Sequence, residues 1–287
     1  MDLFDFDFSK EEDKQDEVNK LNSGYKLIFF DTETTGAKSD DQIIEIGSIV
    51  EDSEGNYEQY EELCATSNGK LIHPEAMVTH GIRNEDLKGC KNFQESSFYK
   101  DLAKLNNPAN YLIAHNLPFD LARLEYYGFN SNLKHIDTLQ CAKHLFELGE
   151  SLGEYEYELP NYKLQTFRYI LFSKKDEIYE AKKYDVKLDA HRAIGDVVVL
   201  KMFFQKLLKR TNLEGVEALD KLVELSAKPV LVKKFNFGKY KGRLIKDVYI
   251  QDPGYIEWLY KDISKQKKSG EKIDKNLYET LKEVIGK

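Results

Sequence analysis

The chain has 287 residues, of which 41% are hydrophobic and 32% are charged, enough for one good core and an appendage. No apolar run reaches the length of a membrane-spanning helix, so the sequence predicts no membrane insertion. The formal net charge of -8 is unevenly distributed, because residues 226–287 carry 15 Lys or Arg against 8 Asp or Glu. A surface that contacts a phosphate backbone is therefore expected at this end.

Residues 1–24 are acidic, with 8 Asp or Glu against 3 Lys, and lack apolar periodicity. They are predicted to form a disordered arm. Apolar side chains within Met1–Phe8 could dock on a protein partner or pack on the chain's own domain. These acidic residues lack the basic region of a secretory signal. Three widely spaced cysteines suit a reducing compartment: Cys64, Cys90 and Cys141. Both features predict a cytoplasmic location.

The run Tyr25–Phe30 is apolar and aromatic, as in a buried strand, and it leads into Asp31-Thr32-Glu33. Side chains two residues apart on a strand face the same way, so Asp31 and Glu33 would present their carboxylates at one point. That point is a candidate site for a hard metal ion. The alternative for an isolated Asp-x-Glu pair is a solvated strand end.

Strands are next predicted at 42–50 and 57–65, joined by a Gly-Asn hairpin signal, and helical pieces at 74–106. A strand at 111–114 then runs into His115-Asn116-Leu-Pro118-Phe-Asp120. Asn116 suits a helix N-cap and Pro118 suits the first turn. Asp120 would therefore lie in the opening turn of a helix that ends near residue 128.

A further strand is predicted at 133–137, with helices near 138–147 and 162–173. The third polar segment contains His191 and Asp196. In one continuous helix these two side chains would lie about 140° apart around the axis and could not converge. His191 is therefore predicted on the loop or cap before a helix at 191–210, with Asp196 inside it. The charged residues 173–188 are either a flap over the substrate or a solvated helical excursion.

Residues 211–228 are predicted to be a helical linker, and residues 229–287 a small basic α+β module. Its first segment alternates aromatic residues with Lys and Gly, as in a strand that enters a turn. Lys239, Lys241 and Arg243 could grip phosphates while Tyr240 stacks on a base. The alternative is that the aromatic residues and Trp258 form the module's core and the lysines are solvated.

The chain resembles the DEDD exonucleases of the DnaQ-like group, in the subgroup with His in the third motif. Three motifs carry the resemblance, in the family's order: Phe30-Asp-Thr-Glu-Thr-Thr-Gly36, His115-Asn-Leu-Pro-Phe-Asp120 and His191-x4-Asp196. The C-terminal module looks like the one that follows exonuclease X-like enzymes. The resemblance implies an α/β, RNase H-like fold over residues 25–210, with a mixed five-stranded sheet flanked by helices.

The resemblance also implies a 3′-to-5′ exonuclease that releases nucleoside monophosphates by two-metal-ion hydrolysis. Oxygen ligands favour two divalent cations, Mg²⁺ or Mn²⁺. By analogy, Asp31, Glu33 and Asp196 hold the cation on the nucleophile side, and Asp31 and Asp120 hold the other. His191 would be the general base.

By the same analogy, a further set of residues would bind the end of the substrate strand: Thr34, Thr35, His80, Ile82, Asn116 and Phe119. His80 could instead belong to a plain turn. The expected partner is nucleic acid, with DNA in repair or proofreading preferred over RNA 3′-end trimming. The alternative from another class is a non-catalytic nucleic-acid-binding adaptor, and the intact set of five catalytic residues argues against it.

Overall fold

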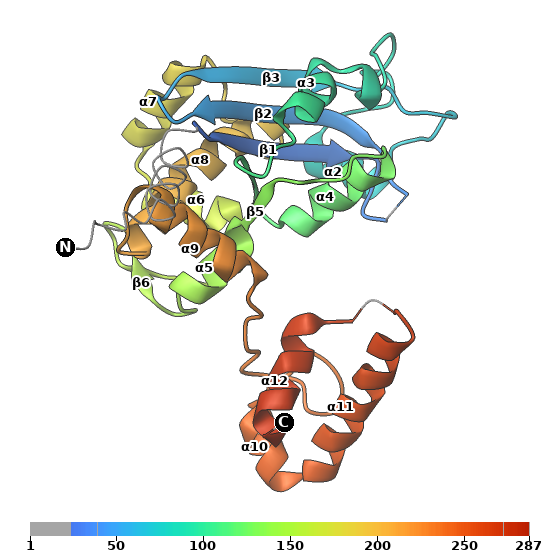
Figure 1. The fold of residues 1–287 in the computed structure, drawn as a ribbon, viewed down its shortest axis with the longest axis vertical. Helices are drawn as coiled ribbons and strands as arrows, with labels where there is room; N and C mark the ends of the chain where they lie inside the picture. Colours follow the sequence, from blue (N-terminus) through green and yellow to red (C-terminus); the bar gives the residue numbers. More distant parts are fainter. Residues whose placement is uncertain (1–23, 39, 272, 287) are drawn as a thin grey trace, which may run out of the picture. The chain divides into compact units, whose positions relative to one another are not determined.

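The computed structural model describes residues 24–38, 40–271 and 273–286 (Figure 1). The chain forms two compact units, one ending at Val223 and the other running from Glu224 to Lys287. Within the described ranges, no helix is long and apolar enough to cross a membrane. The predicted disordered arm and the docking hypothesis for Met1–Phe8 concern residues outside these ranges.

A mixed five-stranded sheet in the order β3-β2-β1-β4-β5 forms the centre of the first unit. Its strands are β1 (Lys26–Thr34), β2 (Ile43–Asp52), β3 (Tyr57–Leu63), β4 (Tyr111–Ala114) and β5 (Lys134–Asp137). β1, β2 and β3 pair antiparallel, whereas β4 runs parallel to β1 and β5 parallel to β4. This is the predicted RNase H-like sheet. Because β1 and β4 are parallel, the segments that follow them start from the same edge.

Helices cover both faces of this sheet, as Figure 1 shows for α3 and α4 on one side and α8 on the other. The helices are α2 (Pro74–His80), α3 (Ser97–Leu105), α4 (Leu117–Tyr126), α5 (Thr138–Leu145), α6 (Leu164–Leu171), α7 (Lys174–Tyr184), α8 (Ala193–Arg210) and α9 (Gly215–Ala227). A 3-10 turn at Phe93–Glu95 precedes α3. These elements agree with the predicted ranges to within a few residues. The short ribbon of β6 (Ser151–Leu152) and β7 (Tyr157–Glu158) was not predicted.

The alternation of side chains along β1 explains why helices pack on both faces. Phe30 stacks on Phe98 of α3 with ring centroids 6.2 Å apart, whereas Phe29 meets Phe204 of α8 at 5.2 Å. β2 is covered in the same way and has eight consecutive buried residues, as expected for a strand with two covered faces. The face of Phe29 is also the face of Asp31 and Glu33, two and four residues further along.

The charged segment after α6 forms α7, which is anchored to its own unit. Arg168 of α6 forms an ion pair with Glu177 at 2.8 Å. Tyr184 is buried at the end of α7, with its ring 5.0 Å from that of Tyr57. The segment is thus helical, and whether it also covers the substrate stays a prediction. The predicted helical linker at residues 211–228 contains α9, whose Leu222 is buried within the first unit.

The second unit is built from α10 (Ile245–Gln251), α11 (Pro253–Lys268) and α12 (Lys275–Ile285). Its core contains eight buried side chains: Phe235, Ile245, Val248, Ile256, Leu259, Ile263, Leu277 and Leu281. The β content of its described residues is one isolated bridge, between Lys234 and Leu244. The regular secondary structure of the predicted α+β module is therefore helical apart from this bridge. The expected strand is cut short because Gly238 and Gly242, with φ of 67° and 84°, turn the chain after Phe237.

Candidate active site

β1, the central strand of the sheet, carries the first two predicted site residues near its carboxyl end. The strand runs through Asp31 and Glu33 to Thr34. Its antiparallel neighbour β2 places Gly47 opposite Asp31 and Glu45 opposite Glu33. Because Gly47 has no side chain, the sheet has a gap beside Asp31, on the face covered by α8.

The first turn of α8 fills this gap. A Cβ on Gly47 would overlap main-chain atoms of Ala193 and Ile194, so only glycine permits the observed contact. Gly195 in the same turn allows a second close approach, since a Cβ there would lie 2.8 Å from the carbonyl oxygen of Asp189. Asp196 follows directly. The docking of this turn is therefore what brings Asp196 to β1.

His191 and Asp196 converge although they are five residues apart. His191 precedes α8 with φ of 60°, and Asp196 lies in the first turn of the helix, as predicted. The backbone N–H of His191 donates a 3.1 Å hydrogen bond to the Asp196 carboxylate. Glu33, His191 and Asp196 each offer one possible ligand atom, and these atoms all lie within 4.8 Å of one another.

Asp120 reaches the cluster from the opening turn of α4, where the sequence placed it. Its buried carboxylate accepts a 2.6 Å hydrogen bond from the Thr32 hydroxyl of β1. Asn116 occupies the N-cap position but has φ of 79°, and its side chain makes no capping hydrogen bond. Its backbone N–H donates to Asp137 instead, at 3.0 Å. The chain therefore turns sharply between β4 and α4, which aims Asp120 back at β1.

The pKa of each of the four carboxylates is raised, by burial in every case and also by neighbouring carboxylates at Asp31 and Glu33. Burial, followed by the charges of Asp120 and Asp196, raises the pKa of Asp31 well above its usual range. Burial and the charge of Asp196 raise the pKa of Glu33 to about 9. Burial raises the pKa of Asp120 to about 7 and that of Asp196 to about 6. Acids that hold protons near neutral pH can be neutralised instead by cations, and carboxylate oxygens are the donors that hard divalent cations prefer. The residues therefore fit a divalent metal centre.

Glu45 is a member of this region that the sequence analysis missed. It is 1% exposed, and its carboxylate accepts hydrogen bonds from Arg192 at 2.6 Å and from the backbone N–H of Ala193 at 3.0 Å. These bonds tie the start of α8 to β2. A usable signal was present, because a lone acid inside the apolar run of residues 43–50 must find a partner if that strand is buried.

Gln165 and Thr32 were missed as well. Gln165 of α6 donates to the Asp196 carboxylate at 2.5 Å, and Thr32 donates to Asp120. Each hydrogen bond fixes the orientation of a carboxylate that could hold a metal. Neither residue could be found from spacing, because the donor and acceptor are 31 and 88 residues apart.

A family model for exonucleases matches residues 28–204, more than half of the chain. The chain belongs to the exonuclease family. It is therefore a nuclease, that is, a phosphodiester hydrolase. A second model, for the exodeoxyribonuclease X-like C-terminal region, matches residues 235–264, which lie in the second unit.

Exodeoxyribonuclease 10 of Escherichia coli (strain K12) is 25% identical over 242 residues, covering 83% of this chain and 91% of that protein. Among solved structures, E. coli exonuclease I in complex with a dT13 oligonucleotide matches with a TM-score of 0.49 and 20% identity, over 65% of this chain and 41% of that one. Exonuclease X in complex with 5′ overhanging duplex DNA matches with a TM-score of 0.45 and 18% identity, over 69% of this chain and 99% of that one. The chain thus matches less than half the length of exonuclease I.

A pocket of about 680 Å³ opens beside the exonuclease carboxylates, with Glu33 in its wall. Four of the six residues predicted to bind the substrate end also line it: Thr34, Thr35, His80 and Phe119. Ile82 instead packs in a core cluster with Ile44, so its side chain is not available to a substrate. Asn116 is exposed and lies outside the pocket lining.

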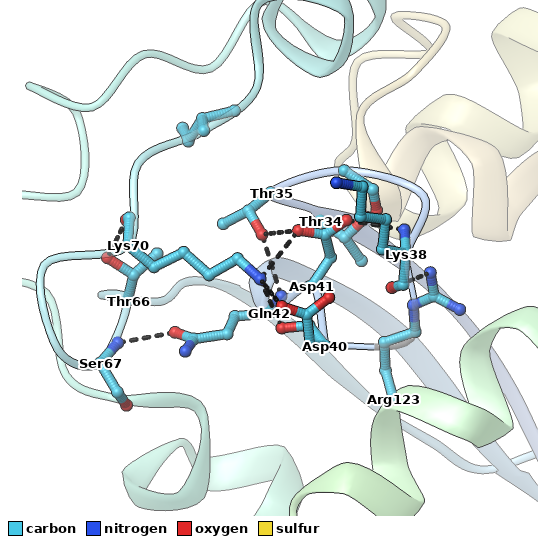
Figure 2. A network of polar contacts seen from close by, with 12 residues as sticks. Thr34, Thr35, Lys38, Asp40, Asp41, Gln42, Thr66, Ser67, Lys70 and Arg123 are labelled. Atoms are coloured by element: carbon cyan, nitrogen blue, oxygen red, sulfur yellow. Dashed lines mark hydrogen bonds and ion pairs between the residues drawn. The ribbon is translucent and has the colours of Figure 1, made fainter.

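Polar contacts hold the pocket wall that follows β1 (Figure 2). The Thr35 hydroxyl donates to Asp41 at 2.9 Å, and Lys70 lies 3.0 Å from the same carboxylate. The Thr35 backbone N–H donates to the carbonyl oxygen of Gln42. The Thr34 hydroxyl donates to the carbonyl oxygen of Gly36. The hydroxyl donors that were expected to meet the substrate are therefore satisfied within the protein, and they stiffen the wall.

His80 is buried rather than placed in an exposed turn. It lies in the last turn of α2, and its Nδ1 accepts a hydrogen bond from the backbone N–H of Ile82 at 3.0 Å. Burial lowers the pKa of His80, which favours the neutral imidazole. His115 is neutral for the same reason, because burial lowers its pKa to about 4.

In the C-terminal module the structure corrects the expectation for Tyr240. Its hydroxyl donates to Asp252 at 2.6 Å, and its ring packs edge-on against that of Tyr255 at 5.0 Å. Lys239 forms an ion pair with the same Asp252 at 3.1 Å. Tyr240 is thus half-buried against the module's core, and its hydroxyl and ring already have partners within the protein. The alternative for Trp258 is also wrong, because this side chain is 58% exposed. Two other predicted contacts are exposed: Lys241 and Arg243.

Proposed function

We propose that this exonuclease removes nucleoside monophosphates from the 3′ end of DNA, by hydrolysis that requires two divalent cations, Mg²⁺ or Mn²⁺. The observation that carries the proposal is the convergence of four carboxylates and His191 at one sheet edge, beside an open pocket. DNA is preferred to RNA because the relative covering most of the chain is an exodeoxyribonuclease. We also propose a role in DNA repair or proofreading.

Asp31, Glu33 and Asp196 would hold one cation, and Asp31 and Asp120 would hold the other. When bound, the cations would activate water as the nucleophile and stabilise charge on the leaving oxygen. The raised pKa values mean that the carboxylates must lose protons before they can act as ligands. Thr32 and Gln165 would keep two of these carboxylates oriented as they change partners.

His191 would take the proton from the attacking water. Its side chain is exposed, while its backbone N–H is tied to Asp196. The imidazole is therefore held beside the carboxylates and remains accessible to solvent and substrate. Histidine is the side chain most often used as a general base in enzymes.

The pocket is proposed to receive the terminal nucleotide. Phe119 has the Arg123 guanidinium 3.6 Å from its ring centroid on one side, which holds the ring in place. We place the exonuclease domain at residues 25–210 and the basic module at 229–287, and propose that Lys239, Lys241 and Arg243 contact phosphates. A cytoplasmic location is proposed because Cys64, Cys90 and Cys141 all remain thiols.

Single-stranded DNA and RNA oligonucleotides, labelled at either the 3′ or the 5′ end, would test the polarity and the substrate. With Mg²⁺ we expect the 3′ label to appear at once as a mononucleotide, and the 5′-labelled strand to shorten one nucleotide at a time. DNA should be cleaved faster than RNA, and EDTA should stop both reactions. Internal cuts, early release of the 5′ label or faster cleavage of RNA would contradict the proposal.

A further inference from the structure

Trp258 is the one tryptophan of the chain, and it lies largely in solvent on α11. The opposite side of α11 packs in the module's core, where it contributes Ile256, Leu259 and Ile263. Trp258 is 58% exposed although its indole is the largest apolar surface available to a small core. A single exposed apolar residue is ordinary on a protein surface, so its surroundings decide whether it has a function.

Three lysines continue from Trp258 along the same side of α11: Lys261, Lys265 and Lys268. They follow at spacings of three, seven and ten residues, which places all of them within about 80° of Trp258 around the axis. The row extends about 15 Å along the helix. All three lysines are exposed, and the structure records no ion pair for them within the described residues.

The indole ring of Trp258 packs against a neighbouring aromatic side chain of the module. The ring of Tyr255 lies 5.9 Å from that of Trp258 at an interplanar angle of 36°. Tyr255 is fixed in turn by ring contacts with Phe235 and Tyr240, at 5.9 and 5.0 Å. The ammonium group of Lys239 lies 5.0 Å from the Tyr255 ring centroid. Trp258 is therefore an exposed aromatic ring that packs on a fixed Tyr255 ring and lies close to lysine side chains.

A structural role explains only part of this arrangement. Lys265 and Lys268 lie in the last turn of α11, where positive charge stabilises the helix dipole. That argument does not apply to Lys261, which is further from the helix end, nor to the exposed ring. The module as a whole also carries an excess of positive charge, since residues 226–287 contain 15 basic against 8 acidic residues. A flat apolar ring followed by a row of cations is complementary to an unstacked base followed by its phosphates.

We propose that Trp258, Lys261, Lys265 and Lys268 form a binding surface for single-stranded nucleic acid, with one base stacked on the indole and the phosphates following the lysines. The inference rests on the proposed function, since it supplies a nuclease with a second hold on its substrate strand. Duplex bases are already stacked on one another, so a blunt duplex offers this surface phosphates but no free base.

The intrinsic fluorescence of the full-length chain tests the proposal directly, because Trp258 is its one tryptophan emitter. The titration uses dT20 and U20 in EDTA, so that no strand is cleaved. We expect both strands to quench the emission in a saturable manner and a blunt DNA duplex to quench it less. Absence of quenching by both strands at low salt would overturn the proposal and favour a protein contact at this surface.

Two variants separate the ring from the charges. Trp258→Ala should weaken binding of a dye-labelled dT20 by about 5- to 150-fold, the range measured for loss of one base stack, and Trp258→Phe should restore part of it. Ile250→Ala is the matched control, because Ile250 is 82% exposed in the same module, and it should leave the affinity unchanged. Equal affinity of the Trp258→Ala variant and the wild type would overturn the role of the ring.

The triple variant Lys261→Ala, Lys265→Ala and Lys268→Ala should reduce the slope of log affinity against log salt by about 2, since each phosphate contact on a single strand contributes about 0.7. Trp258→Ala should leave that slope unchanged. Removal of three exposed lysines from α7, at Lys174, Lys175 and Lys182, controls for net charge. An equal loss of slope in the control would contradict a specific surface. Cleavage with Mg²⁺ is measured separately, so quenching without cleavage refutes the nuclease proposal and cleavage without quenching refutes this one.

Discussion

Buried carboxylates that face one another are unstable as a group of anions. In this chain the effect is largest at Asp31 and Glu33, whose charges are also opposed by Asp196. Two like charges about 4 Å apart repel by roughly 4 kcal/mol at an effective dielectric constant of 20. Protons or cations must relieve this repulsion. The cluster is therefore tuned to bind cations at the expense of the stability of the metal-free protein.

Replacing Glu33 with Gln tests, in EDTA, how far the carboxylate cluster lowers the stability of the metal-free protein. The pKa of Glu33 is raised from 4.5 to about 9, so the folded state binds a proton more tightly than the unfolded state. The free energy of unfolding of the wild type should therefore fall as the pH rises from about 5 to about 9. The Gln variant has no carboxylate to deprotonate, so near pH 9 it should melt at a higher temperature than the wild type. Each kcal/mol of difference in the free energy of unfolding should raise the melting temperature by about 2 to 4 °C. Thermal melts across this pH range would show it. A difference that does not grow with pH would contradict the assignment.

His191 can be tested with a substitution that respects its backbone. Its φ of 60° is tolerated by Asn better than by Ala, so His191→Asn removes the base with little added strain. We expect cleavage to slow by about 100-fold or more. Titration of Mn²⁺ should show nearly unchanged metal affinity. A large loss of metal affinity would make His191 a ligand, with the base elsewhere.

At the scale of elements, the position of α8 decides whether the site exists. Its first turn lies directly on β2 at Gly47, and the ion pair of Glu45 with Arg192 holds it there. Asp196 is displaced by any shift of this turn. The geometry of the site is thus set by a contact between a strand and a helix that are about 150 residues apart.

Gly47→Ala should therefore damage stability and activity together. Its Cβ would overlap the main chain of α8, and overpacking of this kind costs about 1–3 kcal/mol. Chemical denaturation and cleavage of a short oligonucleotide would measure the two effects. Gly254→Ala is the matched control, because its Cβ would meet only Asp252 Oδ1, at 3.8 Å. If the Gly47 variant were as stable and active as the control variant, the docking of α8 would not set the site.

Much of the fold could be predicted from the sequence because its signals are local. Short apolar runs mark β1, β2 and β4, and the i, i+2 spacing of Asp31 and Glu33 places both on one face. The loop position of His191 followed from helix geometry alone. The contact between Gln165 and Asp196 left no such signal, because the two residues are 31 positions apart, whereas Glu45 could have been found as a lone acid in an apolar run. The exposure of Trp258 and the packing of Tyr240 could not be predicted, because aromatic spacing does not say which rings the few core positions of a small module will take.

At the scale of the whole molecule, charge is divided between the two parts of the chain. Residues 25–225 carry 24 Lys or Arg and 34 Asp or Glu, whereas residues 226–287 carry an excess of basic residues. A nuclease with an acidic catalytic region repels the phosphates that it must approach. If the module binds phosphates as proposed, its positive charge would offset part of this repulsion.

The most direct measurement is the Mg²⁺-dependent cleavage rate of Asp31→Ala beside that of the wild type. Asp31 is proposed to hold both cations, so its loss should lower the rate by several orders of magnitude. The variant also loses a carboxylate that its neighbours repel, so in EDTA it should melt no lower than the wild type, which shows that the fold survives. Substantial Mg²⁺-dependent cleavage by the folded variant would contradict the two-cation centre.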